Sequence, residues 1–230
     1  MMGIILTRLF QSIVLPALLF VSFSVSALTD QPVQSEQNQS DPPPSVAPIP
    51  GPHFILNAGW TFGGDTVDSA RYTNGDSTSV KGGGLLQFGL GGLYQFESSP
   101  ISLLLSANYH FHNVTASNGN MTFSRFPIEF LGYYTGIERF RIGGGVRFVN
   151  SAEVSKKING STEKTTFDNT TGYVVEVGYH IGQPVWFNVR YVSEKYQGNT
   201  YTSPSGATIS LVGTKPLNGS HIGAGFTFVF

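Results

Sequence analysis

The sequence lacks cysteine and has few charged residues. The absence of cysteine excludes a disulfide scaffold and a thiolate metal site. Only 12% of the 230 residues are charged, against ~25% in soluble domains. Thirteen Lys and Arg residues and 14 Asp and Glu residues give a net charge of −1. The clustered basic excess of a nucleic-acid-binding protein is therefore missing, and we expect no nucleic-acid partner.

Long apolar runs are also scarce, and hydrophobic residues make up only 40% of the chain. This excludes a helical membrane protein, which needs repeated stretches of about 20 apolar residues. The residues that are abundant are Gly, Phe and Tyr, with 28, 18 and 10 copies. Low charge combined with many glycines and aromatic residues suits a β structure whose side chains alternate between two very different environments.

The first 27 residues have the pattern of a secretory signal peptide. Arg8 supplies a positive charge, and an apolar stretch interrupted by Pro16 follows from Ile13 to Val25. The small residues Val25 and Ala27 stand at the −3 and −1 positions of a cleavage site. The apolar stretch is too short for a spanning helix, so we predict cleavage after Ala27 rather than an uncleaved anchor.

Residues 28–52 form a segment rich in Gln, Ser and Pro without apolar periodicity. Such a composition cannot bury enough surface to offset the entropy of ordering the chain. We expect a disordered periplasmic linker in extended, partly polyproline conformation. The alternative is a binding segment for a proline-reading partner.

Residues 53–230 alternate between apolar and polar side chains, which is the signature of strands with two distinct faces. Eight segments carry a large, aromatic-rich apolar face opposite a face of Gly, Asn, Ser, Thr and a few Arg and Glu residues. A soluble sandwich or lipocalin-like barrel would carry many Lys and Glu residues on its polar face. The pattern therefore predicts an all-β fold, an eight-stranded antiparallel transmembrane β-barrel. The apolar faces lie in residues 54–62, 86–96, 103–111, 126–130, 140–148, 173–179, 185–191 and 222–230.

The connections between these segments alternate between long and short, as in outer-membrane barrels. The long connections are residues 63–83, 113–122, 150–171 and 197–220. Because the number of strands is even, we expect both termini in the periplasm and the long loops outside the cell. Each long loop contains Asn-Gly, a pair that favours tight hairpins, at positions 74–75, 118–119, 159–160 and 218–219. Closure of the barrel requires the first and last strands to pair.

The C-terminal residues resemble the insertion signal of bacterial outer-membrane proteins, with Gly225, Phe228 and Phe230 at the matching positions. This resemblance implies recognition by the barrel-assembly machinery. The segments Phe123–Phe130 (FSRFPIEF) and Phe140–Val146 (FRIGGGV) are similar to the superfamily of small outer-membrane barrels that includes outer-membrane proteins A, X and W. The resemblance implies location in the outer membrane of a Gram-negative bacterium and leaves the activity open.

Strand parity places four positive and three negative side chains inside the barrel. Unpaired buried charges are costly, so we predict that they pair and plug the narrow lumen. A gated ion path or a small-ligand site is the alternative. The predicted lumen network consists of Arg125, Glu129, Arg141, Arg147, Glu176, Arg190 and Glu194.

Three histidines, His110, His112 and His221, fall near the same end of the barrel. They lack Cys or carboxylate companions, so we expect no metal. Ser220 and His221 are adjacent, so their side chains point to opposite faces, and no His-x-Ser pair is present. We therefore expect no catalytic residues and no cofactor. We also expect aromatic girdles at both membrane interfaces, from Phe96, Tyr133, Tyr134, Trp186 and Phe230 at one rim and Trp60, Phe62 and Tyr191 at the other.

These observations favour a monomeric barrel with a structural or surface-interaction role through its outer loops. The loops carry five lysines, which makes outer-membrane lipid, lipopolysaccharide or a host-surface ligand the expected partner. These are Lys81, Lys156, Lys157, Lys164 and Lys215. The alternatives are a narrow pore or small-ligand carrier and, third, an enzyme that modifies lipid.

Overall fold

The computed structural model describes residues 49–71, 77–116 and 119–230. The predicted signal peptide and nearly all of the predicted linker lie outside the described residues. The first strand begins at Gly51, two residues before the expected start of the barrel. Among the described residues, no helix has the length and hydropathy needed to cross a membrane.

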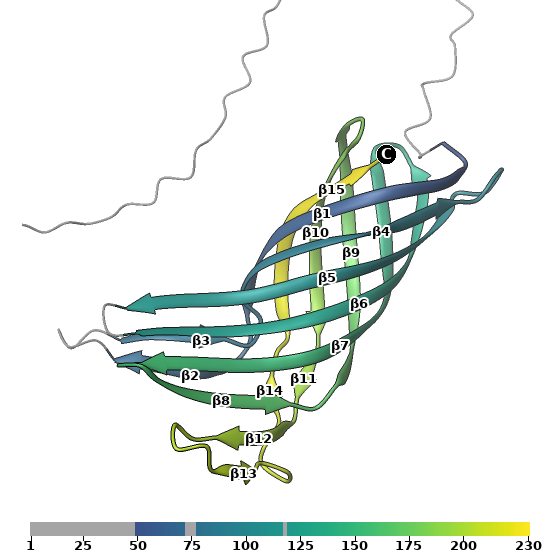
Figure 1. Cartoon of the computed structure of the whole chain (residues 1–230). Coiled ribbons are helices and arrows are strands. Elements are labelled where there is room, and N and C mark those ends of the chain that lie inside the picture. The colour runs from purple at the N-terminus through teal and green to yellow at the C-terminus, as the bar shows by residue number, and fades with distance from the viewer. Residues whose placement is uncertain (1–48, 72–76, 117–118) are drawn as a thin grey trace, which may run out of the picture. The chain divides into compact units, whose positions relative to one another are not determined.

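Eight strands close into an antiparallel barrel (Figure 1), which confirms the predicted architecture. Each strand pairs with its neighbour in this series, and β1 pairs with β15 from Ile55 opposite Val229 to Gly63 opposite His221. Pairing of β7 with β9 completes the ring. The barrel strands are β1 (Gly51–Gly63), β4 (Leu85–Gln95), β5 (Ile101–Ala116), β6 (Gly119–Ile137), β7 (Phe140–Ile158), β9 (Thr170–Gly182), β10 (Val185–Ser193) and β15 (His221–Val229).

Side chains alternate between the outside and the inside of the barrel as predicted. Phe54 and Trp60 are each 51% exposed on the outside, whereas Ile55 between them is fully buried. The same contrast separates exposed Leu90 from buried Leu93 on β4. The barrel therefore presents an apolar outer surface, the arrangement expected for strands in contact with hydrocarbon.

The girdle prediction is wrong for Tyr133 and Trp186, which are buried inside the barrel. Tyr134, next to Tyr133, is exposed on the outside. Trp186 lies between two outward residues, Val185 and Phe187, so strand alternation turns it inward. Its ring packs against the Arg141 guanidinium, 4.8 Å from the ring centroid, and this contact accounts for an aromatic residue in the lumen.

The two ends of the barrel differ in the length of their connections, as the sequence predicted. At the short-turn end, β6 and β7 are separated by only Glu138 and Arg139. At the opposite end, strands and loops continue beyond the barrel (Figure 1). We call this part the loop cap. It contains the ends of β5, β6 and β7 together with β2 (Thr66–Arg71), β3 (Ser77–Lys81), β8 (Ser161–Phe167), β11 (Lys195–Tyr196), β12 (Gly198–Thr202), β13 (Thr208–Ser210) and β14 (Leu217–Asn218).

The Asn-Gly pairs have three different outcomes. Asn159 and Gly160 have φ values of 49° and 84° and connect β7 to β8 in a tight hairpin, as predicted. Asn218 and Gly219 do not form a hairpin turn, because Asn218 belongs to β14 and pairs with Lys195 of β11. The pair at 74–75 and the first residue of the pair at 118–119 lie outside the described residues.

The loop cap has a hydrophobic core of its own. Met121 and Phe123 of β6 pack with Val149 and Val154 of β7 and with Tyr196 of β11, and all five side chains are buried. A bulge permits this arrangement. Register shifts between residues 124 and 126 of β6, so Ser151 and Ala152 lie opposite a single residue and the inward side of β7 changes from odd to even positions.

Candidate functional site

The lumen contains a continuous chain of ion pairs from β6, β7, β9 and β10. Glu129 binds two guanidinium groups, with Arg147 Nη1 at 2.9 Å and Arg190 Nη2 at 2.8 Å. Arg190 also contacts Glu176 through Nε at 3.2 Å, and Glu176 lies 3.4 Å from Arg141 Nη2. Five of the seven predicted lumen residues are thus joined in one chain.

The remaining two predicted residues extend this chain toward the loop cap. Arg147 Nε lies 3.0 Å from Glu194 Oε2, and Arg125 Nε lies 3.7 Å from Glu194 Oε1. Arg125 is completely buried. Its guanidinium carbon also stands 4.8 Å from the Phe123 ring centroid and 5.7 Å from that of Tyr196. The Glu194 carboxylate is too distant to neutralise Arg125 fully. Cation–π attraction to the two rings therefore stabilises the remaining positive charge.

Uncharged side chains add hydrogen bonds to the network. Arg147 donates to Gln87 Oε1 at 3.1 Å, and Arg141 donates to Asn188 Oδ1 at 2.8 Å. The Tyr133 hydroxyl donates to Glu176 at 2.9 Å. Sequence reasoning did not assign these three residues to the network. Parity had already placed Gln87 and Asn188 on the inward face, so that signal was available for them.

The Tyr196 hydroxyl donates to Glu194 Oε1 at 2.5 Å and joins the network to the loop cap. Burial raises the pKa of the Tyr196 phenol, so the hydroxyl keeps its proton and remains a donor. Gly219 allows this position, because a Cβ there would lie 2.3 Å from the Tyr196 ring. No sequence pattern pointed to Tyr196, since the loop that carries it has no strand parity to follow.

His110 is held by several partners inside the lumen. Arg147 Nη2 lies 3.0 Å from His110 Nδ1, and the Thr61 hydroxyl lies 2.7 Å from Nε2. Arg125 Nη2 lies 3.2 Å from the same Nε2, so a guanidinium group, which can only donate, faces each ring nitrogen. His110 is therefore enclosed by Arg125, Arg147 and Thr61 as part of the lumen network.

The three histidines considered for a metal do not converge. His110 and His221 are neighbours, with ring centroids 5.2 Å apart. His112, however, accepts a hydrogen bond from the Lys81 backbone N–H at 3.2 Å. Among the residues that the structure describes, no group of three His, Cys, Asp or Glu side chains is placed to hold a metal ion.

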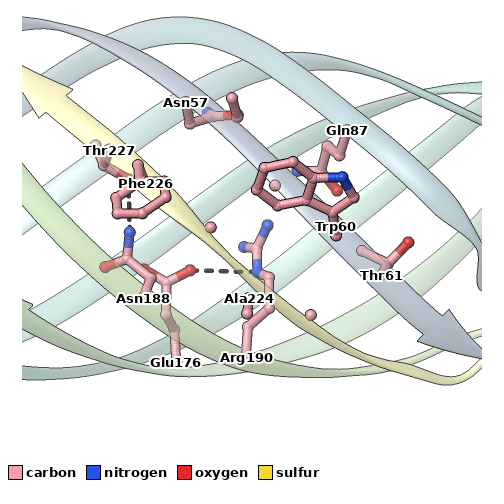
Figure 2. Close-up of a pocket in the computed structure, with 14 residues that line it drawn as sticks. Asn57, Trp60, Thr61, Gln87, Glu176, Asn188, Arg190, Ala224, Phe226 and Thr227 are labelled. Atoms are coloured by element: carbon pink, nitrogen blue, oxygen red, sulfur yellow. Dashed lines mark hydrogen bonds and ion pairs between the residues drawn. The ribbon is translucent and has the colours of Figure 1, made fainter. Parts of the chain in front are cut away.

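A small cavity of about 40 Å³ remains beside the ion pairs (Figure 2). Arg190, Asn188 and Gln87 point into it, and Gly223 and Gly225 leave space on its β15 wall. Its polar lining and volume suit one or a few water molecules. A cavity of this volume admits water and no larger solute.

The last strand ends within the barrel wall. Phe230 N–H donates to the Phe54 carbonyl at 2.9 Å, and Phe54 N–H donates to the Phe230 carbonyl at 3.2 Å. Gly225 lies against β1, where a Cβ would approach the Ala58 carbonyl to 2.4 Å. The role of Gly225, Phe228 and Phe230 as an insertion signal stays a prediction.

The barrel has an apolar exterior, a ring closed by β1 and β15 and an interior that holds paired charged side chains. The fold is that of a small outer-membrane β-barrel. The structure is similar to the crystal structure of Neisserial surface protein A (NspA), with a TM-score of 0.46, 10% identity and coverage of 78% of this chain and 97% of that protein. It is also similar to the outer membrane protein OprG from Pseudomonas aeruginosa, with a TM-score of 0.45, 15% identity and coverage of 79% and 97%. No protein-family model and no curated protein matches the sequence.

Proposed function

We propose that this protein is a closed barrel of the Gram-negative outer membrane that uses its loop cap as a contact surface outside the cell, with both termini in the periplasm. One observation carries the proposal. The lumen is filled by seven charged side chains that pair with one another, whereas the loop cap is built as a folded unit with its own core. In a pore, charged side chains would line an open channel. Here the charged side chains pair across the lumen, and the long loops fold into the cap.

The exterior of the barrel supports residence in a membrane. Phe88, Leu105, Phe130, Ile142 and Val175 are all between 47% and 57% exposed, although they come from five different strands. A soluble protein rarely exposes so large a continuous apolar surface. In hydrocarbon, closure by β1 and β15 is required because an open edge would leave N–H and C=O groups without partners.

The lysines of the loop cap support contact with anionic groups. Lys156 pairs with Asp68 at 3.2 Å and Lys164 with Glu153 at 2.7 Å, so these two are already neutralised. Lys81, Lys157 and Lys215 are exposed and occur in no ion pair among the described residues. We infer that these three contact phosphate groups of lipopolysaccharide, which surrounds an outer-membrane protein on its outer side.

Conductance of the purified protein in a planar bilayer tests the closed lumen. We expect no stable conductance steps, whereas a trimeric porin in the same bilayer serves as the positive control. Large stable steps from the unmodified protein would contradict closure and favour the pore. The substitution Glu129→Ala removes the carboxylate shared by two guanidinium groups and is expected to produce flickering currents.

Native mass spectrometry of the protein extracted with its lipids tests the contact surface. The triple variant Lys81→Gln, Lys157→Gln, Lys215→Gln is expected to retain several-fold less lipopolysaccharide than the unmodified protein. Arg139→Gln provides the matched control, because Arg139 is exposed at the short-turn end. Equal retention by the triple variant would overturn the lipopolysaccharide contact.

A further inference from the structure

The loop cap contains a second cavity, of about 200 Å³, that none of the seven charged lumen residues lines. Hydrocarbon and aromatic groups from five parts of the cap form most of its wall. They are Val67 of β2, Val154 of β7, Phe167 of β8, Tyr196 of β11, and Leu211 and Leu217 from the segments around β14. An engineered apolar cavity of about 150 Å³ is large enough to bind benzene. The cavity therefore has room for one six-membered ring with a small substituent.

The wall of this cavity is held in place before any ligand arrives. The Tyr196 ring makes edge-to-face contact with Phe123 at 5.5 Å and a tilted contact with Phe167 at 5.9 Å between ring centroids. Its hydroxyl is anchored on Glu194, so the ring rather than the hydroxyl faces the cavity. A preformed wall spares a ligand the cost of ordering side chains on binding.

The charges around the cavity favour an anion. Two ionic side chains line it, Asp68 and Lys215. The Asp68 carboxylate is neutralised by Lys156 at 3.2 Å. Lys215 is exposed, and no ion pair among the described residues includes it. A ligand in the cavity therefore meets one ammonium group without a carboxylate partner.

We propose that this cavity binds small aromatic carboxylates, with the ring against Tyr196, Leu211 and Leu217 and the carboxylate at Lys215. The assignment shares Lys215 with the proposed lipopolysaccharide contact and does not depend on lumen closure. An apolar site with a few placed polar groups is the usual form of a small-molecule pocket. The ion pair between the ligand carboxylate and Lys215 lies at the exposed mouth of the cavity. It therefore favours the anion over a neutral analogue by only a modest factor.

Saturation-transfer NMR on the full chain in detergent micelles tests the proposal, with benzoate as the probe and empty micelles as the blank. We expect saturable binding of benzoate and several-fold weaker binding of benzyl alcohol. Leu211→Trp places an indole in the cavity and is expected to weaken benzoate binding at least tenfold. Val212→Trp is the matched control, since Val212 is adjacent, 74% exposed and not part of the wall.

A second pair of variants tests the charge without altering the core. Lys215→Gln is expected to weaken benzoate binding about three- to fivefold and to leave benzyl alcohol unchanged. Lys195→Gln, at an exposed lysine of the cap that does not line the cavity, is expected to change neither. Equal binding by Leu211→Trp and Val212→Trp, or a benzoate signal no larger than in empty micelles, would overturn the site. Equal affinity for benzoate and benzyl alcohol in the unmodified protein would overturn the selection of anions.

Discussion

Glu129 shows how single residues hold the barrel interior together. It lies between Arg147 and Arg190 at distances of 2.9 and 2.8 Å, and it is almost completely buried. Removal of one partner from a buried ion pair leaves the other charge uncompensated, which costs far more than the intact pair contributes. Glu129 therefore stabilises the barrel because, without its carboxylate, two guanidinium groups inside the barrel would lose a shared ion-pair partner.

We expect Glu129→Gln to lower the free energy of unfolding by about 3 kcal/mol, the lower end of the range for breaking a buried pair. Urea unfolding in lipid vesicles, followed by tryptophan fluorescence, measures the change. Glu138→Gln is the control, because Glu138 is exposed in the turn between β6 and β7. The same small loss in both variants would show that the network does not stabilise the barrel.

Gly143 marks a position where the absence of a side chain is required. A Cβ there would lie 2.3 Å from the Tyr133 ring and 2.7 Å from the Gly132 carbonyl. Gly143→Ala is therefore expected to displace Tyr133 from Glu176 and to destabilise the barrel by about 1–3 kcal/mol, as overpacking does. Gly92→Ala, whose nearest neighbour would be 3.8 Å away, is expected to be neutral in the same urea titration. Equal stability of the two variants would argue against this close packing.

At the scale of elements, strand parity predicted most of the barrel because side chains alternate with a period of two. The outward faces of all eight segments and the burial of Arg125, Arg147 and Glu176 follow from parity, and the pairing of β1 with β15 follows from closure of the barrel. The error at Tyr133 and Trp186 arose because residue type was given more weight than parity. Two adjacent residues of a strand cannot both face lipid.

Other features of the elements were out of reach of the sequence. Parity places Arg147 and Glu194 inside the barrel but does not state that they meet, since this depends on the register between strands that are distant in the chain. The bulge opposite Arg125 changes the parity of β7 at Ser151. No pattern in the sequence predicted this bulge. The core of the loop cap depends on this bulge and could not be predicted either.

The hairpin between β7 and β8 provides a prediction about an element. Gly160 has a φ of 84°, a conformation that costs a residue with a Cβ about 1–2 kcal/mol. Gly160→Val is expected to speed amide hydrogen exchange in residues 153–166 and to leave the barrel strands unchanged. Gly182→Val, at a glycine with open space around it, should not alter exchange in that hairpin. Unchanged exchange in residues 153–166 of Gly160→Val would show that the Asn-Gly turn does not hold the extension.

For the whole molecule, two hydrophobic surfaces have opposite roles. The outer surface of the barrel meets its surroundings, whereas the core of the loop cap is closed on itself. Most of the charged side chains of the barrel strands point into the lumen, so the outward faces of these strands carry little charge. This division is the basis for the proposal of membrane contact by the exterior, closure by the interior and binding by the cap.

The two tryptophans test this division directly, because Trp60 is 51% exposed on the outside and Trp186 is 3% exposed inside the barrel. Each is examined alone, with Trp186→Phe retaining Trp60 and Trp60→Phe retaining Trp186, in vesicles of brominated phospholipid. Bromine quenches only a tryptophan that it can contact. We expect strong quenching of Trp60 and little quenching of Trp186. Equal quenching of both, or protection of Trp60, would contradict a barrel whose apolar face lies against hydrocarbon.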